Sequence, residues 1–213
     1  MVEMNVKKVL KGTDPFILDV NIRVVDREIV AFTGKSGSGK TTLLRMIAGF
    51  EKPDTGTIIN DRSVWYDSGS KKHVPPFKRH LGYVFQDYAL FPHLNVSRNI
   101  SCATVGSDSR YIDCLLERAG MGGFGNRKIH NLSGGQKQKV AFLRALVRNA
   151  PLMLLDEPFS ALDTENRTVF RSLLLEHQKE TGCSVVLVSH DSSDICELAQ
   201  RTIMIESGAA TEV

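Results

Sequence analysis

The octapeptide Gly34–Thr41 (GKSGSGKT) has the composition of a phosphate-binding loop. Its glycines let the backbone curl so that successive N–H groups point inward, and the helix expected after it adds a positive N-terminal end. We expect Lys40 to reach the β and γ phosphates of a nucleotide and the Thr41 hydroxyl to be a ligand of Mg²⁺. The motif predicts a nucleoside triphosphate site, and the residues assigned to it are Gly34, Lys35, Ser36, Gly37, Ser38, Gly39, Lys40, Thr41 and Thr42.

An acidic pair, Asp156 and Glu157, follows the apolar run LMLL at 152–155. Asp156 is expected to hold Mg²⁺ through a water molecule. Glu157 is expected to orient the water that attacks the γ phosphate, or to accept its proton. Because two adjacent carboxylates repel each other, their place beside a triphosphate requires Mg²⁺ and lysine to offset the charge. The pair therefore favours hydrolysis over passive binding.

A second glycine-containing motif, LSGGQ at 132–136, opens the helical pattern QKQKVAFLRALVR. Ser133 occupies an N-cap-like position, and Gly134 and Gly135 leave backbone N–H groups uncovered, which predicts a second phosphate-binding site. This site has no lysine of its own, and one nucleotide needs only one such site. We interpret Ser133, Gly134, Gly135 and Gln136 as groups that close over the γ phosphate held by a second copy of the chain.

The elements that must position these residues alternate between short apolar strands and amphipathic helices. Strands are predicted for EIVAFT from Glu28, LGYVF, LMLLD, SVVLVS and TIMIE, and helices for residues 41–49, 164–180 and from 191 onward. Such alternation is typical of a mainly parallel sheet covered on both faces. VNIRVV, TGTIIN and SVWY predict a further, antiparallel layer. The predicted fold class is α/β, a P-loop NTPase (RecA-like) core with a mainly parallel sheet, an N-terminal antiparallel β layer and an inserted α-helical lobe.

A helical pattern between about Asp87 and Val147 delimits the lobe. The length of the chain suits a single domain over residues 1–213. Within it, we expect the nucleotide-binding core and the β layer in 1–86 and 148–213, and the helical lobe in 87–147.

Composition and charge exclude several classes of protein. No run approaches the roughly 18 apolar residues that span a bilayer, and the N-terminus lacks the apolar core of a signal peptide, so we expect a cytosolic chain. The net charge of +3 is mild and evenly spread, which argues against a nucleic-acid partner. The basic residues around Pro75 and Pro76 are expected to form a solvated loop. The cysteines lack CxxC or metal-type spacing and are expected to be reduced packing residues; they are Cys102, Cys114, Cys183 and Cys196.

Together with SALD at 160–163 and VSHD at 188–191, these motifs resemble the nucleotide-binding subunit of an ATP-binding cassette (ABC) transporter, over nearly the whole chain. The resemblance implies ATP and Mg²⁺ as cofactors, and Mg-dependent ATP hydrolysis coupled to transport. It implies three partners: a second copy of the chain in an ATP-sandwich dimer, an integral membrane permease and, indirectly, an extracytoplasmic solute-binding protein. No nucleic acid is implied. The subunit would lie peripherally at the cytoplasmic face of the cell membrane.

The resemblance also implies roles for single residues. Gln86 matches a glutamine that contacts Mg²⁺ and the attacking water and that links the core to the lobe. The alternative interpretation of Gln86 is a surface residue at the end of a strand. Asp163 matches an aspartate that runs along the dimer interface, although it is equally suited to cap the following helix. His190 follows a buried strand and so shares a sheet edge with Asp156, and its implied role is to contact the γ phosphate. Phe16 is the upstream aromatic candidate for adenine stacking, with core packing as the alternative.

The segment Phe85–Ile100 is rich in aromatic and apolar residues around Pro92. In importers of this family the corresponding surface forms a groove for a short permease helix, and packing of lobe on core would account for about half of the same residues. The chain is most similar to importers of inorganic oxyanions such as molybdate, tungstate or sulfate, with polyamine, iron and sugar importers next. Many relatives carry a C-terminal regulatory domain, whereas this chain ends at 208–213 just after the last predicted strand, which indicates a short or truncated member.

Two alternatives come from other classes of protein. A soluble cassette ATPase acting on DNA would need a long coiled coil in the lobe, and one acting on the ribosome would carry two cassettes in one chain; the sequence has neither. A P-loop kinase or GTPase would leave LSGGQ, SALD and VSHD unexplained. We therefore predict an ATP-binding and ATP-hydrolysing subunit of an importer.

Overall fold

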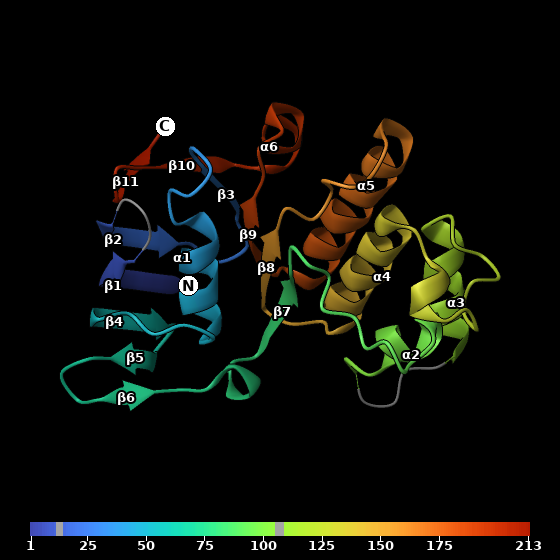
Figure 1. The fold of residues 1–213 in the computed structure, drawn as a ribbon, viewed down its shortest axis with the longest axis horizontal. Helices are drawn as coiled ribbons and strands as arrows, with labels where there is room; N and C mark the ends of the chain where they lie inside the picture. Colours follow the sequence, from blue (N-terminus) through green and yellow to red (C-terminus); the bar gives the residue numbers. More distant parts are fainter. Residues whose placement is uncertain (12–14, 105–108) are drawn as a thin grey trace.

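The computed structural model describes residues 1–11, 15–104 and 109–213, in which two β-sheets and their helices form layers (Figure 1). The first sheet is antiparallel and has five strands in the order β2-β1-β4-β5-β6. Their bounds are Val2–Leu10 for β1, Phe16–Val24 for β2, Thr55–Asn60 for β4, Ser63–Asp67 for β5 and Lys72–His73 for β6. Buried and exposed residues alternate along most of β1 and β2, because one face of this sheet packs on the interior and the other faces solvent.

The second sheet has six strands in the order β11-β10-β3-β9-β8-β7 and is parallel except where β11 pairs with β10. The bounds are Ile29–Thr33 for β3, Leu81–Val84 for β7, Leu152–Asp156 for β8, Ser184–Val188 for β9, Arg201–Glu206 for β10 and Ala209–Glu212 for β11. Strands β8 and β9 are buried along their whole length, as expected where both faces are covered. Because β3, β9 and β8 are neighbours, the segments that follow them start at one edge of the sheet.

The helices divide the interior into two cores. Helix α1 (Lys40–Ala48) lies between the two sheets and shares a core with both. The opposite face of the six-stranded sheet packs on a second core that includes α4 (Gly134–Val147) and α5 (Thr164–Thr181). The remaining helices are α2 (Val96–Ser101), α3 (Ser109–Arg118) and α6 (Ser192–Leu198), with 3₁₀ turns at Pro76–Lys78 and Ile129–Asn131.

A buried cation joins the antiparallel sheet to the end of α1. Arg79 is 1% exposed, and its guanidinium donates hydrogen bonds of 2.7 to 3.2 Å to the carbonyls of Ile47, Met46, Val74 and Trp65. Met46 and Ile47 lie in the last turn of α1, where the helix carries partial negative charge. Burial lowers the pKa of Arg79 to about 10, so the side chain remains charged at neutral pH. Arg79 therefore caps the C-terminal end of the helix that follows the phosphate-binding loop.

The α/β fold predicted from the sequence is confirmed: the mainly parallel sheet, the antiparallel sheet and the helical region are all present. Three expectations were wrong in detail. Among the described residues between 87 and 147, α-helices cover 96–101, 109–118 and 134–147, and the four glycines at 120–125 accompany turns. Lys72–His73 form strand β6 instead of belonging to a solvated loop, and β10 is followed by a further strand. Within the described residues, no helix is both long and apolar enough to cross a membrane.

Candidate active site

The phosphate-binding loop lies between β3 and α1, as predicted. Gly34 has a φ of 131°, and a Cβ atom there would lie 2.1 Å from the Ile205 carbonyl oxygen, so only glycine fits. Lys40 is 4% exposed, and its Nζ donates to the carbonyls of Gly34 and Lys35, both at 2.8 Å. Burial lowers the pKa of Lys40, against the raising effect of nearby carboxylates. The loop is thus closed around a buried ammonium group.

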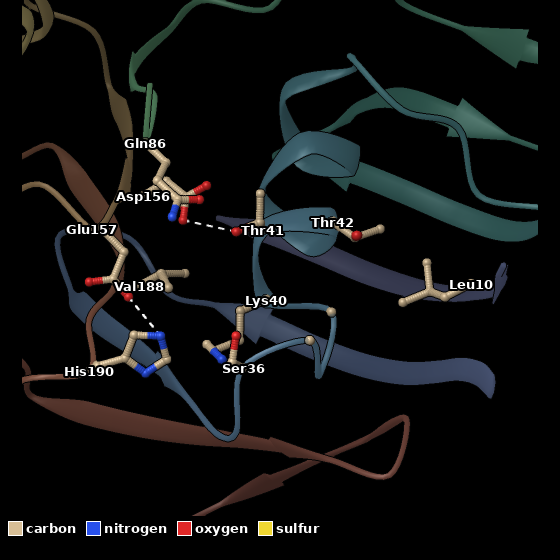
Figure 2. A pocket seen from close by; sticks show the side chains of 12 residues that line it. Leu10, Ser36, Lys40, Thr41, Thr42, Gln86, Asp156, Glu157, Val188 and His190 are labelled. Atoms are coloured by element: carbon tan, nitrogen blue, oxygen red, sulfur yellow. Dashed lines mark hydrogen bonds and ion pairs between the residues drawn. The ribbon is translucent and has the colours of Figure 1, made fainter. Parts of the chain in front are cut away.

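Asp156 ends strand β8 and faces the first turn of α1. Thr41 Oγ1 donates to Asp156 Oδ1 at 3.0 Å (Figure 2). Burial raises the pKa of the Asp156 carboxyl, against the lowering effects of Thr41 and of nearby cations. The hydroxyl, the carboxylate and the Gln86 amide offer oxygen ligands of the kind that Mg²⁺ prefers, and a bound cation would stabilise the charge on a poorly solvated carboxylate. The residues present therefore fit this metal.

Glu157 follows Asp156 with left-handed backbone geometry, at a φ of 52°. Its Oε1 lies 3.0 Å from Nε2 of His190, which stands just after β9 (Figure 2). Burial has the largest effect on the pKa of the Glu157 carboxyl and raises it; Asp156 raises it further, while His190 and Lys40 lower it. A carboxyl group with a raised pKa beside an imidazole is suited to accept and return a proton.

One pocket brings most of the predicted residues together. The phosphate-binding loop and α1 supply Ser36, Gly37, Gly39, Lys40, Thr41 and Thr42, and the sheet edge supplies Gln86, Asp156, Glu157 and His190. Gln86 enters from the segment between β7 and α2, at the junction of the sheet with the helices. Leu10 and Val188 complete the lining and were not predicted. Their apolar side chains resemble those of any strand residue, so the sequence carries no signal for them.

Phe16 lies beside the phosphate-binding loop but outside this pocket. The residue is half-buried at the start of β2 and lines a neighbouring pocket together with residues 35–38 and 205–207. A Cβ atom on Gly208 would be 3.4 Å from Phe16 Cδ2, so the ring packs near the turn between β10 and β11. An aromatic ring in this position can contact a base bound next to the loop.

The LSGGQ motif (Leu132–Gln136) lies elsewhere in the fold. Ser133 is the N-cap of α4 and forms a capping box, in which its Oγ accepts from the Gln136 N–H at 3.2 Å and its N–H donates to Gln136 Oε1 at 3.0 Å. Ser133 and Gly134 are exposed, and residues 133–136 do not line the pocket that contains Lys40. The motif and the phosphate-binding loop of the same chain are therefore separate.

Asp163 is the N-cap of α5, as the local alternative predicted. Its Oδ1 accepts from the Asn166 backbone N–H at 2.8 Å, and the Asn166 side-chain amide donates to both carboxylate oxygens. The backbone and side-chain bonds from Asn166 lower the pKa of Asp163. Asp163 does not line the nucleotide pocket, and its place along a dimer interface stays a prediction.

Two polar residues that were not predicted contact the loop after Glu157. Gln138 on α4 is 2% exposed and binds the loop through its amide, and Arg167 on α5 reaches the Phe159 carbonyl. Gln138 could have been identified in the sequence as a polar residue on the buried side of the helix QKQKVAFLRALVR. Arg167 looks like an ordinary exposed helical arginine in the sequence.

The chain matches the family model described as ABC transporter over residues 17–160. It is 39% identical to a probable sulfate/thiosulfate import ATP-binding protein CysA of Chlorella vulgaris, over 91% of this chain and 82% of that protein. It is 41% identical to the Fe(3+) ions import ATP-binding protein FbpC of Haemophilus influenzae, over 92% of this chain but 57% of that protein. The chain thus spans little more than half the length of the second relative.

A solved structure has the same fold over the whole chain. It is the dimeric post-hydrolysis state of the ATP-binding cassette MJ0796 bound to ADP and Pi, with a TM-score of 0.86 and 31% identity, covering 100% of this chain and 98% of that one. Family model, relatives and fold agree with the geometry of the pocket. The chain therefore belongs to the ABC transporter family and is an ATP-hydrolysing ATP-binding cassette.

Proposed function

We propose that the chain is the ATP-hydrolysing subunit of an importer and drives uptake of a small solute through a separate membrane permease. The observation that carries the proposal is one pocket in which Lys40 and Thr41 face Asp156, Glu157 and His190. This arrangement suits phosphoryl transfer to water, because phosphate-binding, metal-binding and proton-accepting groups converge. Relatives named as import ATP-binding proteins support the transport role.

Each side chain of the pocket has a distinct proposed role. Lys40 exchanges the loop carbonyls that it now contacts for the β and γ phosphates. Glu157 orients the attacking water and accepts its proton, and His190 holds the Glu157 carboxylate and contacts the γ phosphate. Thr41, Asp156 and Gln86 would hold Mg²⁺, which supplies charge neutralisation at the phosphates when bound. Phe16 stacks on the adenine.

The LSGGQ motif is proposed to act on the nucleotide of a second copy of the chain. Ser133 and Gly134 are exposed at the N-terminus of α4, and uncovered N–H groups at such an end attract phosphate. The chain's own phosphate-binding loop does not use them, since residues 133–136 lie outside its pocket. The MJ0796 cassette, 31% identical, is described as a dimer, which supports this arrangement. Asp163, exposed at the start of α5, would lie along the same interface.

A groove between β7, α2 and α4 is proposed to receive a short helix of the permease. Phe85, Phe91 and Ala103 give the groove apolar walls, and Arg144 and Arg148 add positive charge. An amphipathic helix with acidic residues on its polar side would complement such a groove. We propose that residues 87–147 move as a lobe when the dimer closes, and that this motion carries the docked permease with it. The subunit would then lie peripherally at the cytoplasmic face of the membrane.

The proposed solute is an inorganic oxyanion such as sulfate, molybdate or tungstate, delivered by an extracytoplasmic solute-binding protein. The sulfate/thiosulfate relative, at 39% identity, supports an oxyanion, whereas the Fe(3+) relative, at 41% identity, names a cation. Because the proposed contact is with the permease, the cassette sequence constrains the solute only indirectly. Co-purification of the permease, followed by ATPase assays with each solute and its binding protein, identifies the cargo. Stimulation by DNA or ribosomes instead would support a soluble cassette ATPase.

The dimer is tested with Glu157→Gln, which removes the proposed proton acceptor while keeping the shape of the side chain. This variant should hydrolyse ATP far more slowly than the wild type and form an ATP-bound dimer in light scattering with Mg²⁺. Ser133→Arg should abolish hydrolysis while ATP affinity stays within about threefold of wild type, because Ser133 lies outside the chain's own pocket. Glu157→Gln that remains monomeric at saturating ATP would contradict the proposal.

A further inference from the structure

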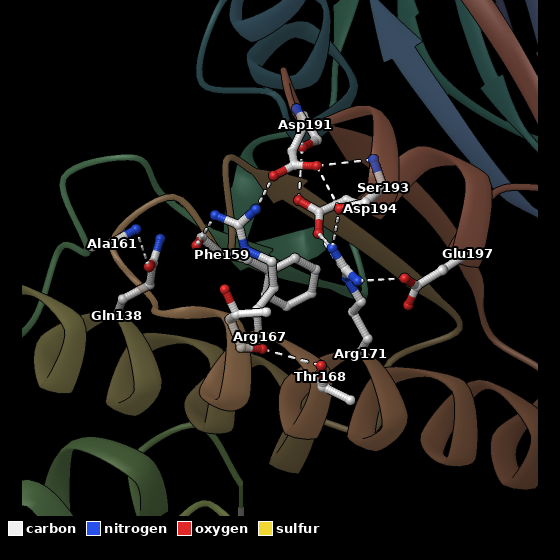
Figure 3. A network of polar contacts seen from close by, with 12 residues as sticks. Gln138, Phe159, Ala161, Arg167, Thr168, Arg171, Asp191, Ser193, Asp194 and Glu197 are labelled. Carbon is white, nitrogen blue, oxygen red and sulfur yellow. Dashed lines mark hydrogen bonds and ion pairs between the residues drawn. The ribbon is translucent and has the colours of Figure 1, made fainter.

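A buried glutamine ties the helix of the LSGGQ motif to the loop that carries the proposed proton acceptor. Gln138, in α4, donates through Nε2 to the Glu157 carbonyl at 2.8 Å and to Ser160 Oγ at 3.2 Å. Its Oε1 accepts from the Ala161 N–H at 2.8 Å (Figure 3). All the hydrogen bonds of this side-chain amide therefore end on the segment 157–161.

These bonds fix the backbone of Glu157. The residue has a φ of 52°, a left-handed geometry that side chains other than glycine adopt only when the surroundings hold it. Its N–H donates to the Val188 carbonyl at 3.0 Å, and its carbonyl accepts from Gln138. With both peptide groups held, the Glu157 side chain is directed toward His190. Ser160 also donates to this carbonyl, from its exposed Oγ at 3.1 Å and from its N–H at 3.4 Å.

The start of α4 has little room to move relative to this loop. A Cβ atom on Gly135 would lie 2.8 Å from the Ala161 carbonyl oxygen, so the motif packs its backbone directly on the loop. Gln138 lies less than one turn further along the same helix, and a helix moves as a unit over so short a distance. A displacement of the LSGGQ motif therefore displaces the peptide group of Glu157.

The other side of the loop is held from α5. Arg167 pairs with Asp191 and donates to the Phe159 carbonyl at 3.4 Å (Figure 3). Asp191 directly follows His190, so the same arginine contacts both segments that carry the Glu157–His190 pair. The opposite support comes from α4, which belongs to the lobe proposed to move, and Gln138 is its contact with the loop.

We propose that Gln138 is a positioning residue that couples the two nucleotide sites of the dimer. It holds the Glu157 peptide group in place for hydrolysis, and because it lies in the helix that the LSGGQ motif opens, it transmits a displacement of that motif by the partner's nucleotide to Glu157. The inference rests on the proposed function, and it adds a physical link between one copy's ATP and the other copy's catalytic carboxylate.

The test measures kcat, KM and ATP affinity for two variants with different hydrogen bonds. Gln138→Met keeps the size of the side chain and removes every bond, and Gln138→Glu keeps the acceptor for Ala161 but places a carboxylate oxygen against the Glu157 carbonyl. We expect both to lower kcat at least about tenfold, with KM for ATP within about threefold of wild type. Leu173→Ala, a core position within α5, is the control for lost stability, and its kcat should stay near wild type.

A double variant shows whether Gln138 acts through Glu157. In single-turnover assays, Gln138→Met should not slow Glu157→Gln any further, because the carboxylate that it positions is already absent. Either Gln138 variant with wild-type kcat, or an additive effect in the double variant, overturns the inference. A wild-type protein that neither hydrolyses ATP nor dimerises would refute the proposed function itself, and this inference with it.

Discussion

The capping of α1 by Arg79 predicts a large loss of stability when the guanidinium is removed. In Arg79→Met, the bonds to the carbonyls of Met46, Ile47, Val74 and Trp65 disappear. The carbonyls of Met46 and Trp65 each keep a second donor, the N–H groups of Gly49 and Val74 respectively. Each carbonyl left unpaired in the interior costs about 1–3 kcal/mol. With two such carbonyls, and some gain from burying methionine, we expect a loss of about 2–5 kcal/mol in the free energy of unfolding.

Trp65 makes the measurement direct, because it is the single tryptophan of the chain and Arg79 lies over its ring, 5.2 Å from the centroid. Urea unfolding of the ligand-free protein is followed by Trp65 fluorescence and, independently, by far-UV circular dichroism. Arg79→Lys keeps the charge but lacks the planar fork of donors, so its stability should lie between wild type and Arg79→Met. If Arg79→Met unfolds within about 1 kcal/mol of wild type, the capping interpretation is wrong.

Three further predictions concern the pocket and the groove. Burial raises the pKa of Glu157, so ionisation of this carboxyl destabilises the folded state. Glu157→Gln should therefore raise the unfolding free energy of the ligand-free protein by about 0.5–2 kcal/mol at pH values above the raised pKa. Urea titrations should show this gain shrinking as the pH falls from the raised pKa towards the ordinary pKa of glutamate. Gly34→Ala should lower thermal stability and ATP affinity far more than Gly37→Ala, because both glycines have positive φ but only the first would clash, 2.1 Å from a carbonyl oxygen; equal losses in calorimetry would contradict this. Cys102 lines the proposed docking groove, and it can be labelled alone once the other exposed cysteines are changed to serine. A bulky maleimide on Cys102 should abolish stimulation of ATP hydrolysis by the permease and leave the unstimulated rate unchanged. Stimulation that survives complete labelling would place the docking surface elsewhere.

The parts of the site that sequence reasoning predicted are those set by local chain order. The bounds of β8, Leu152–Asp156, coincide with the apolar run LMLLD, and α1 starts at Lys40, directly after the glycines. A parallel sheet then brings the ends of β8 and β9 to one edge, as predicted for Asp156 and His190. The 3.0 Å contact between Glu157 and His190 was not predicted. Four to eight residues of sequence were enough for each motif.

The parts that were missed depend on contacts distant in sequence. In the sequence, Arg79 resembles the other basic residues near a pair of prolines, yet three of its four carbonyl partners lie 14 to 33 residues away along the chain, beyond the reach of any local pattern. Gln138 was missed for the same reason, because the residues that it binds lie 19 to 23 positions later in the chain. Strand β6 has only two residues, too few for an alternating pattern to show.

In the capping box, the Ser133 hydroxyl group caps α4 with its oxygen and keeps its proton free for the proposed phosphate contact. Its oxygen already accepts from the Gln136 N–H, so the hydroxyl proton is what remains to meet an incoming anion. Aspartate begins helices as well as serine does but brings a negative charge in place of that proton. Such an exchange would keep α4 intact and repel a phosphate, so it would separate the folding of the motif from its proposed contact with the nucleotide of a second copy.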